Sequence, residues 1–215
     1  MTYLISTLIF AVVGTAQLNI FEIEGIFSNA HINALEGHIE EYEYTDDDLL
    51  ILQYSSQEGS AESIAELNSL LSGYDFPIGV WFGPYKISID FKQLNNFDYI
   101  GFSPGLEINN VSFDESVEKK YCTINICNFE ERKIIVSTNE GIYDNYLIVG
   151  TLGSFIENID FVISDQSIEF FKPSLFERFY IAISNPIFTY MFFVLGFALI
   201  GLELFAIGPG LMAVV

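Results

Sequence analysis

The chain has 215 residues, of which 29 are acidic and 8 are basic, with a formal net charge of −21. Hydrophobic residues make up 51% and charged residues 17%, which excludes a disordered or low-complexity chain. Bases are scarce: thirteen Asp or Glu and no Lys or Arg precede Lys86. A surface of this charge repels phosphate backbones, so the composition excludes nucleic acid as a partner.

The N-terminus carries an apolar run from Tyr3 to Val13, followed by small residues. Gly14 and Ala16 stand at positions −3 and −1 of a cleavage site after Ala16, which is the pattern of a secretory signal. We therefore predict a signal peptide or signal anchor over residues 1–16. The first residues include no Lys or Arg, and the alternative is the buried first strand of a soluble domain.

The C-terminal region, residues 181–215, contains an apolar stretch from Ile187 to Ala206 in which Glu203 is the single charge. The length of this stretch matches a hydrocarbon core of about 30 Å, so we predict a transmembrane helix over 187–206. Asn185-Pro186 is expected to begin the helix, and Gly208-Pro209-Gly210 to end it. The apolar residues after this turn predict that the sequence is truncated inside the start of a second span.

Two features of this membrane region leave alternatives open. Glu203 either forms a hydrogen bond to another helix as an assembly contact, or extends its carboxylate toward the headgroups. Lys172 and Arg178 flank the span on the side that the N-terminal signal places outside, which the positive-inside rule disfavours. We give the signal more weight and expect a cell-membrane protein whose soluble domain is extracytoplasmic.

Residues 17–180 alternate between strand and helix patterns and predict one α/β domain. Apolar or β-branched runs predict strands at 18–26, 49–52, 77–82 and 98–102, with further candidates at 133–137 and 146–149. Apolar positions three and four residues apart predict helices over 32–42 and from Ser60 to Gly73. Strand-helix-strand order favours parallel pairing. Residues 106–132 show no clear helical period.

Separated motifs connect this pattern with a known family. They are Ile23-Glu24-Gly25-Ile26, the 32–42 helix, Leu49 to Gln53 with a glycine-bearing loop from Ser55 to Gly59, Pro77 to Pro84, Ser103-Pro104-Gly105, and the membrane residues Asn185-Pro186, Leu195-Gly196, Gly201-Leu202-Glu203-Leu204 and Gly208-Pro209-Gly210. In order and spacing they resemble the NfeD family of membrane proteins. The resemblance implies a ClpP/crotonase-like α/β domain at 17–180, followed by the start of a multi-span membrane region.

Active members of that family resemble a Ser-Lys protease, in which a downstream lysine activates the serine and glycine N–H groups stabilise the oxyanion. The resemblance implies Ser88 as the nucleophile, Lys119 or Lys120 as the base and Gly59 in the oxyanion loop. However, the segment from Gly83 to Phe91 lacks the small Ser-Ala-Gly turn of active members, and Gly59 has no glycine partner. We therefore favour a protease-like domain that does not cut, with the two lysines as plain surface cations.

The histidines and cysteines offer little further chemistry. His31 and His38 lie seven residues apart without a third ligand, so we predict surface histidines and no metal site. Cys122 and Cys127 would lie on opposite faces of any regular strand. A disulfide is allowed outside the cytoplasm and would require a turn between them, but we favour unpaired thiols. No phosphate-binding loop or zinc spacing is present, so we predict no cofactor.

Three functions follow from these observations. The first is a membrane-anchored, non-catalytic module of membrane-protein assembly or quality control, for which the resemblance implies partners of the stomatin/band-7 class. ClpP-class domains also tend to form homo-oligomers, which is an analogy at the level of the fold. The second is a membrane-bound serine endopeptidase that uses Ser88 and a lysine base. The third is an exported, anchored domain that binds a small ligand.

Overall fold

The computed structural model describes residues 17–59, 61–89, 94, 96–143, 146–161, 168–171, 173–184 and 186–206. The expected signal peptide at 1–16, the first predicted residue of the second helix (Ser60), and the turn and second span after residue 206 lie outside these residues.

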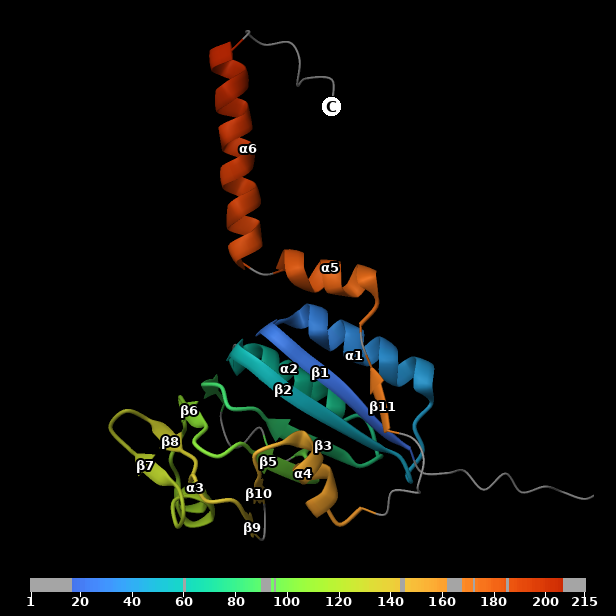
Figure 1. Ribbon diagram of the computed structural model, residues 1–215, viewed down its shortest axis with the longest axis vertical. Helices are drawn as coiled ribbons and strands as arrows, with labels where there is room; N and C mark the ends of the chain where they lie inside the picture. The colour runs from blue at the N-terminus through green and yellow to red at the C-terminus, as the bar shows by residue number, and fades with distance from the viewer. Residues whose placement is uncertain are drawn as a thin grey trace, which may run out of the picture.

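A seven-stranded sheet in the order β11-β1-β2-β3-β5-β10-β9 forms the centre of the domain (Figure 1). Its strands are β1 (Leu18–Phe27), β2 (Leu49–Gly59), β3 (Ile78–Phe82), β5 (Tyr99–Phe102), β9 (Gly141–Tyr143), β10 (Tyr146–Ile148) and β11 (Ile168–Phe171). Neighbouring strands pair in parallel, except β9 and β10, which are antiparallel. The predicted α/β layer with parallel strands is confirmed.

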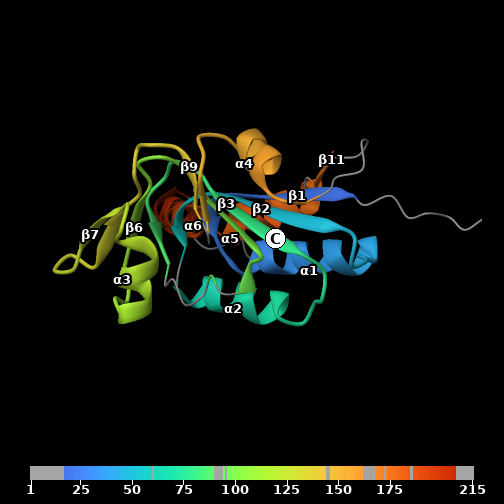
Figure 2. The same cartoon turned by 90° about the horizontal axis from the view of Figure 1, so that it is seen from below.

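Helices cover both faces of this sheet. The described helices are α1 (Asn29–Tyr42), α2 (Ala61–Leu71), α3 (Glu115–Tyr121), α4 (Leu152–Asn158), α5 (Leu175–Ser184) and α6 (Pro186–Ala206). Of these, α1, α2 and α4 pack on the main sheet. On β2, Leu50 and Leu52 belong to the core that includes α1 and α2, whereas Leu49 and Ile51 belong to a second core with α4. Side chains on a strand alternate between faces, so this continuous apolar run serves both cores. Figure 2 shows α1 and α2 on one face of the sheet and α4 on the other.

The predicted loop at 55–59 is wrong, because β2 continues through it to Gly59. The neighbouring strand β1 also continues to Phe27, and a register shift between Gly25 and Ile26 keeps the two strands paired. The buried Ser56 hydroxyl fastens this irregular point: it accepts a hydrogen bond from the Phe27 N–H at 3.2 Å and donates to the Gly25 carbonyl. The paired backbone therefore remains a strand where composition favours a loop.

A smaller sheet with the order β4-β6-β8-β7 lies at one end of the molecule together with α3 (Figure 1). Its strands are β4 (Ile87–Ser88), β6 (Glu107–Asn109), β7 (Ile126–Asn128) and β8 (Lys133–Ile135). The predicted strand at 133–137 is confirmed as β8, whereas α3 was not expected. Helix α3 is too short for a visible period: the Asp114 carboxylate caps it by accepting the Val117 N–H at 3.0 Å, and only Val117 and Tyr121 are buried.

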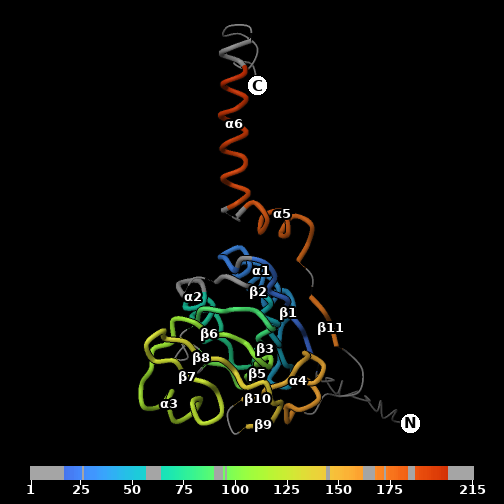
Figure 3. The backbone as a smooth tube through the Cα atoms, turned by 60° about the vertical axis from the view of Figure 1, so that its left-hand side comes forward, coloured from blue at the N-terminus to red at the C-terminus, as the bar shows by residue number. Residues whose placement is uncertain are grey.

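The last two helices lie outside the sheet. Helix α5 lies against α1, and α6 extends away from the domain (Figures 1 and 3). Helix α6 covers the predicted 187–206 segment and begins at Pro186, as expected. Among the described residues, no single helix is long and apolar enough to cross a membrane; Leu175–Ile183 and Ile187–Leu202, bent by 72°, pass that test only as a pair. The Glu203 side chain lies outside the described residues.

Candidate functional site

Ser88 lies in the small sheet, opposite Asn109 of β6. Its half-buried hydroxyl oxygen accepts a hydrogen bond from the Asn110 side-chain amide at 2.6 Å. A serine becomes nucleophilic when a neighbouring base takes its proton. The Asn110 amide nitrogen is a donor and has no free lone pair for that proton. Ser88 is therefore held in place by Asn110 without being activated by it.

The two candidate lysines line a different cavity. Lys119 and Lys120, in the last turn of α3, line a pocket of about 570 Å³ whose wall includes Ser116 and Thr123 but not Ser88. The Lys120 ammonium lies 5.2 Å from the centroid of the Tyr121 ring. Partial burial lowers the pKa of Lys120. The Ser116 hydroxyl in the same pocket wall donates a hydrogen bond to the Asp114 carboxylate at 2.6 Å, next to the N-terminal cap of α3.

The predicted site residues occupy three separate elements: Ser88 in β4, the lysines in α3 and Gly59 at the end of β2. Gly59 pairs with Phe27 in the main sheet. In the part of the chain that the structure describes, β4 lies against β2, whereas the pocket lined by the two lysines includes neither Ser88 nor Gly59. Lys86, two residues before Ser88, forms an ion pair with Glu107 at 3.1 Å.

The prediction of a surface position for His31 is wrong, because its side chain is only 2% exposed. Its Nε2 lies 3.0 Å from the Glu24 carbonyl oxygen, and its Nδ1 accepts the Ser28 N–H at 3.4 Å. A carbonyl oxygen can only accept, so Nε2 carries the proton of the neutral ring. Burial lowers the pKa of His31, and its backbone hydrogen bonds oppose this shift.

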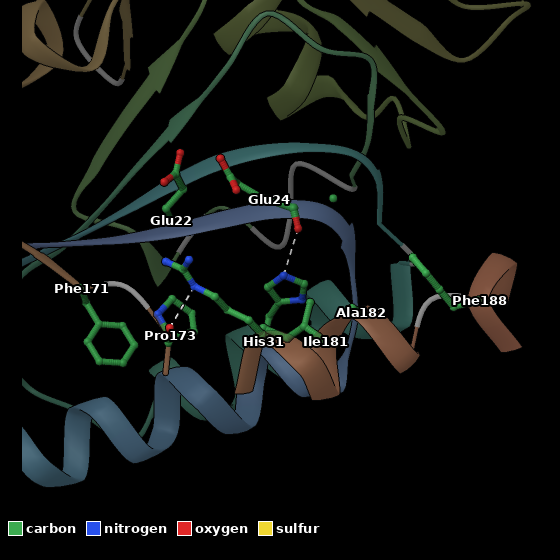
Figure 4. A pocket seen from close by; sticks show the side chains of 10 residues that line it. Glu22, Glu24, His31, Phe171, Pro173, Ile181, Ala182 and Phe188 are labelled. Atoms are coloured by element: carbon green, nitrogen blue, oxygen red, sulfur yellow. Dashed lines mark hydrogen bonds between the residues drawn. The ribbon is translucent and has the colours of Figure 1, made fainter. Parts of the chain in front are cut away.

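His31 lies in the wall of a pocket of about 580 Å³ between the end of β1 and the junction of α5 and α6 (Figure 4). Glu22 and Glu24 contribute carboxylates from β1, Arg178 comes from α5 and Phe188 from α6. The Arg178 Nε donates to the Pro173 carbonyl at 3.0 Å. The lining residues that the structure describes combine charged and apolar side chains and include no serine or cysteine. The sequence did not predict the pocket, because residues about 150 positions apart form it.

His38 is half-buried and stacks on Phe171 with ring centroids 4.0 Å apart. Its Nε2 lies 3.1 Å from the Tyr44 hydroxyl. Burial lowers the pKa of His38, while the carboxylates of Glu41, Glu169 and Glu177 oppose the shift. The ring fixes strand β11 against α1 and is not turned toward a metal ligand set. Among the described residues, no group of three or more His, Cys, Asp or Glu side chains is arranged to hold a metal ion.

The preference for unpaired thiols is wrong, because Cys122 and Cys127 form a disulfide with Cα atoms 5.6 Å apart. Cys122 ends α3 and Cys127 lies in β7, so the chain turns between them. That turn removes the objection that residues an odd number apart point to opposite faces. The buried Asn125 side chain holds the turn: its amide donates to the Tyr121 carbonyl at 2.9 Å and its oxygen accepts the Ser137 N–H at 2.9 Å.

No protein-family model and no curated protein matches the sequence. Solved structures match the fold. The membrane protease 1510-N from Pyrococcus horikoshii, specific for a stomatin homologue, aligns with a TM-score of 0.56 and 9% identity, covering 80% of this chain and 100% of that one. A variant of the membrane-bound stomatin-specific protease 1510-N in complex with a substrate peptide aligns with a TM-score of 0.52 and 8% identity, covering 80% and 99% of the two chains.

Identities this low are evidence of fold and not of activity. The matches cover 80% of this chain, for which the sequence motifs predicted a ClpP-like domain. The domain described here therefore has the mixed α/β fold of these ClpP-like protease structures.

Proposed function

We propose that this chain is an NfeD-like membrane protein whose ClpP-like domain does not catalyse proteolysis and acts in membrane-protein assembly or quality control. The observation that carries the proposal is the environment of Ser88. The Ser88 hydroxyl accepts a hydrogen bond from the Asn110 side-chain amide. The pocket that the candidate lysines line does not include Ser88. A Ser-Lys protease requires serine and lysine within hydrogen-bond reach of each other. A domain that only binds a partner protein does not require contact between a serine and a lysine.

Membrane anchoring by α6 is part of the proposal. The large apolar side chains of α6 between Ile187 and Leu202 are exposed, which is typical of a lipid-facing segment and unusual in a helix of a soluble domain. Proline at its first position suits the start of a helix, and α6 passes the length and apolarity test for a span together with α5 as a bent pair. Glu203, near its end, is then a candidate for an assembly contact with another helix.

An extracytoplasmic position of the domain is proposed on two supports. One is the expected export signal at 1–16. The other is the disulfide between Cys122 and Cys127, because disulfides persist in oxidising compartments and are rare in the cytosol.

A stomatin-type membrane protein is the proposed partner, because the matching structures are described as specific for a stomatin homologue. Homo-oligomer formation is proposed by analogy with other ClpP-class domains.

Binding without cleavage is the direct test of this function. The full chain and a stomatin-type protein from the same source would be purified together in detergent, and the intact mass of the partner followed over time. We expect the two proteins to co-purify and the partner mass to stay unchanged. The variant Ser88→Ala should behave identically. Partner fragments that appear with the wild type and disappear with Ser88→Ala would establish the endopeptidase alternative.

A further inference from the structure

Helix α5 exposes an apolar face among the residues that the structure describes. Leu175 is 84% exposed and Phe176 is 88% exposed, and Phe179, Tyr180 and Ile183 are also exposed. At 3.6 residues per turn these five positions fall within an arc of about 140° on one side of the helix. Large apolar side chains clustered in this way are typical of an interaction surface.

The charged side chains of α5 belong to the opposite side. Glu177 accepts the Ser174 N–H at 2.6 Å, and its own N–H donates to the Ser174 hydroxyl at 3.4 Å, which together form a capping box at the start of the helix. Arg178 lies in the wall of the pocket at the end of β1. The exposed arc of α5 therefore carries no charged side chain, and the helix has its own cap.

The direction of α5 relative to α6 identifies what covers this face. The two helices are bent by 72° at the break between them, and α5 lies across the end of α6 next to the domain (Figures 1 and 3). If α6 crosses a bilayer with a tilt of about 20°, which is average for such helices, α5 can lie in the plane of the membrane surface. Its apolar arc is then continuous with the exposed apolar surface of α6.

We propose that α5 is an interfacial helix, with Leu175, Phe176, Phe179, Tyr180 and Ile183 buried at the boundary between the headgroups and acyl chains of a lipid bilayer. This inference rests on the membrane anchoring of α6 proposed above. Aromatic side chains are favoured at this depth, and an amphipathic helix lies about 5–10 Å into the boundary. The net charge of −21 makes a zwitterionic lipid surface the matching partner, because anionic headgroups would repel the domain.

The placement has a consequence for the pocket beside His31. Arg178, Ile181 and Ala182 of α5 and Phe188 of α6 form part of its wall. Docking of α5 fixes this pocket at the membrane surface, where a segment of a membrane protein next to its span can reach it.

Tryptophan fluorescence in bilayers tests the position of α5. The chain has a single tryptophan, Trp81, which is buried and supplies a constant background. Phe176→Trp and Phe179→Trp report on α5, and Phe193→Trp, at the middle of α6, reports on the span. Ile142→Trp on β9 is the matched control, because Ile142 is 67% exposed and Phe179 is 65% exposed. Full-length variants would be reconstituted into phosphatidylcholine bilayers brominated near the headgroup or near the chain ends.

We expect the two α5 reporters to be quenched most by bromine near the headgroup, Phe193→Trp by bromine near the chain ends, and Ile142→Trp by neither. If Phe193→Trp is quenched while the α5 reporters behave like Ile142→Trp, the interfacial position of α5 is wrong, but the proposed membrane anchoring by α6 is supported. If no reporter is quenched, both are wrong. A concentration-dependent change of the α5 reporters without quenching would assign this face to a second copy and would also overturn the proposal. Near-ultraviolet circular dichroism verifies that each variant is folded.

Discussion

The buried imidazole of His31 ties the start of α1 to the end of β1, and it does so in the neutral form. Burial lowers the pKa of His31 below its ordinary value of 6.5. Below pH 6.5 the unfolded chain takes up a proton that the folded ring resists. The contribution of the neutral His31 ring to the free energy of unfolding is therefore fully present above pH 6.5. It is lost as the pH falls from 6.5 toward the pKa of His31 in the folded state.

We predict that His31→Gln reduces the loss of stability between pH 7.5 and the acid limit of folding. Urea unfolding at a series of pH values measures the slope of the unfolding free energy. His38→Gln is the control: it removes a second histidine of lowered pKa but leaves the His31 contribution in place. A His31→Gln variant with the wild-type slope would contradict the proposed role of the ring.

The buried position of His31 could be predicted from the sequence, whereas the hydrogen-bond partner of Ser88 could not. His31, Leu35 and Ile39 are four residues apart, so the histidine lies on the buried face of α1 that the apolar spacing predicted. The nearest polar partner of Ser88 is Asn110, which follows it by 22 residues and lies in another strand connection. No local pattern reports a contact of that kind. The assignment of Ser88, Lys119, Lys120 and Gly59 as a catalytic set stays a prediction from motifs.

Among the secondary-structure elements, α4 is held by close contact with the sheet. A Cβ atom on Gly101 of β5 would lie 2.5 Å from the Phe155 ring of α4 and 2.9 Å from the Trp81 ring. A Cβ atom on Gly79 of β3 would meet Phe155 at 3.6 Å, which is an ordinary contact. Gly101 thus allows the rings of Phe155 and Trp81 to cover the strand.

We predict that Gly101→Ala lowers the unfolding free energy by about 1–3 kcal/mol, the usual cost of overpacking a core. Gly79→Ala, the matched control on the neighbouring strand, should cost clearly less. Thermal unfolding of the two variants side by side measures the difference. Equal stabilities would show that α4 moves freely enough to accommodate the extra methyl group.

The disulfide between Cys122 and Cys127 constrains the connection from α3 to β7. In the chain-entropy description, closing a loop this short stabilises the fold by about 2 kcal/mol. We predict that the double variant Cys122→Ser/Cys127→Ser loses about this amount in urea unfolding, and that the wild type shows the same loss under reducing conditions. A reductant effect that persists in the double variant would mean that something other than this bond is responsible.

Long patterned elements were predictable, and short or distant ones were not. The strands β1, β3 and β5 and the helices α1 and α2 each carry a clear apolar pattern and were predicted near their observed bounds, whereas only the first part of β2 was predicted. Strand β11 has four residues and pairs with β1, which is about 150 residues earlier in the chain. Its position depends on the stacking of Phe171 on Phe21 and His38. Such contacts between distant residues leave no period in the sequence.

The described part of the chain combines the mixed α/β fold of the ClpP-like protease structures with an exposed apolar helix pair, α5 and α6, in a sequence with a net charge of −21. The two parts are joined through α5, which lies against α1 on one side and exposes aromatic residues on the other. In our account the fold is used for binding beside a membrane. The account therefore depends on whether the domain keeps a reactive serine.

Labelling of the full-length protein in detergent with a serine-reactive fluorophosphonate is the most direct measurement, with Ser88→Ala and Asn110→Ala run in parallel. We predict no labelling of the folded wild type, because the hydrogen-bond partner of the Ser88 hydroxyl among the described residues is the Asn110 amide, which is a donor and not a base. A folded wild type that is labelled, together with a Ser88→Ala variant that is not, would contradict the non-catalytic account and establish an activated nucleophile at Ser88.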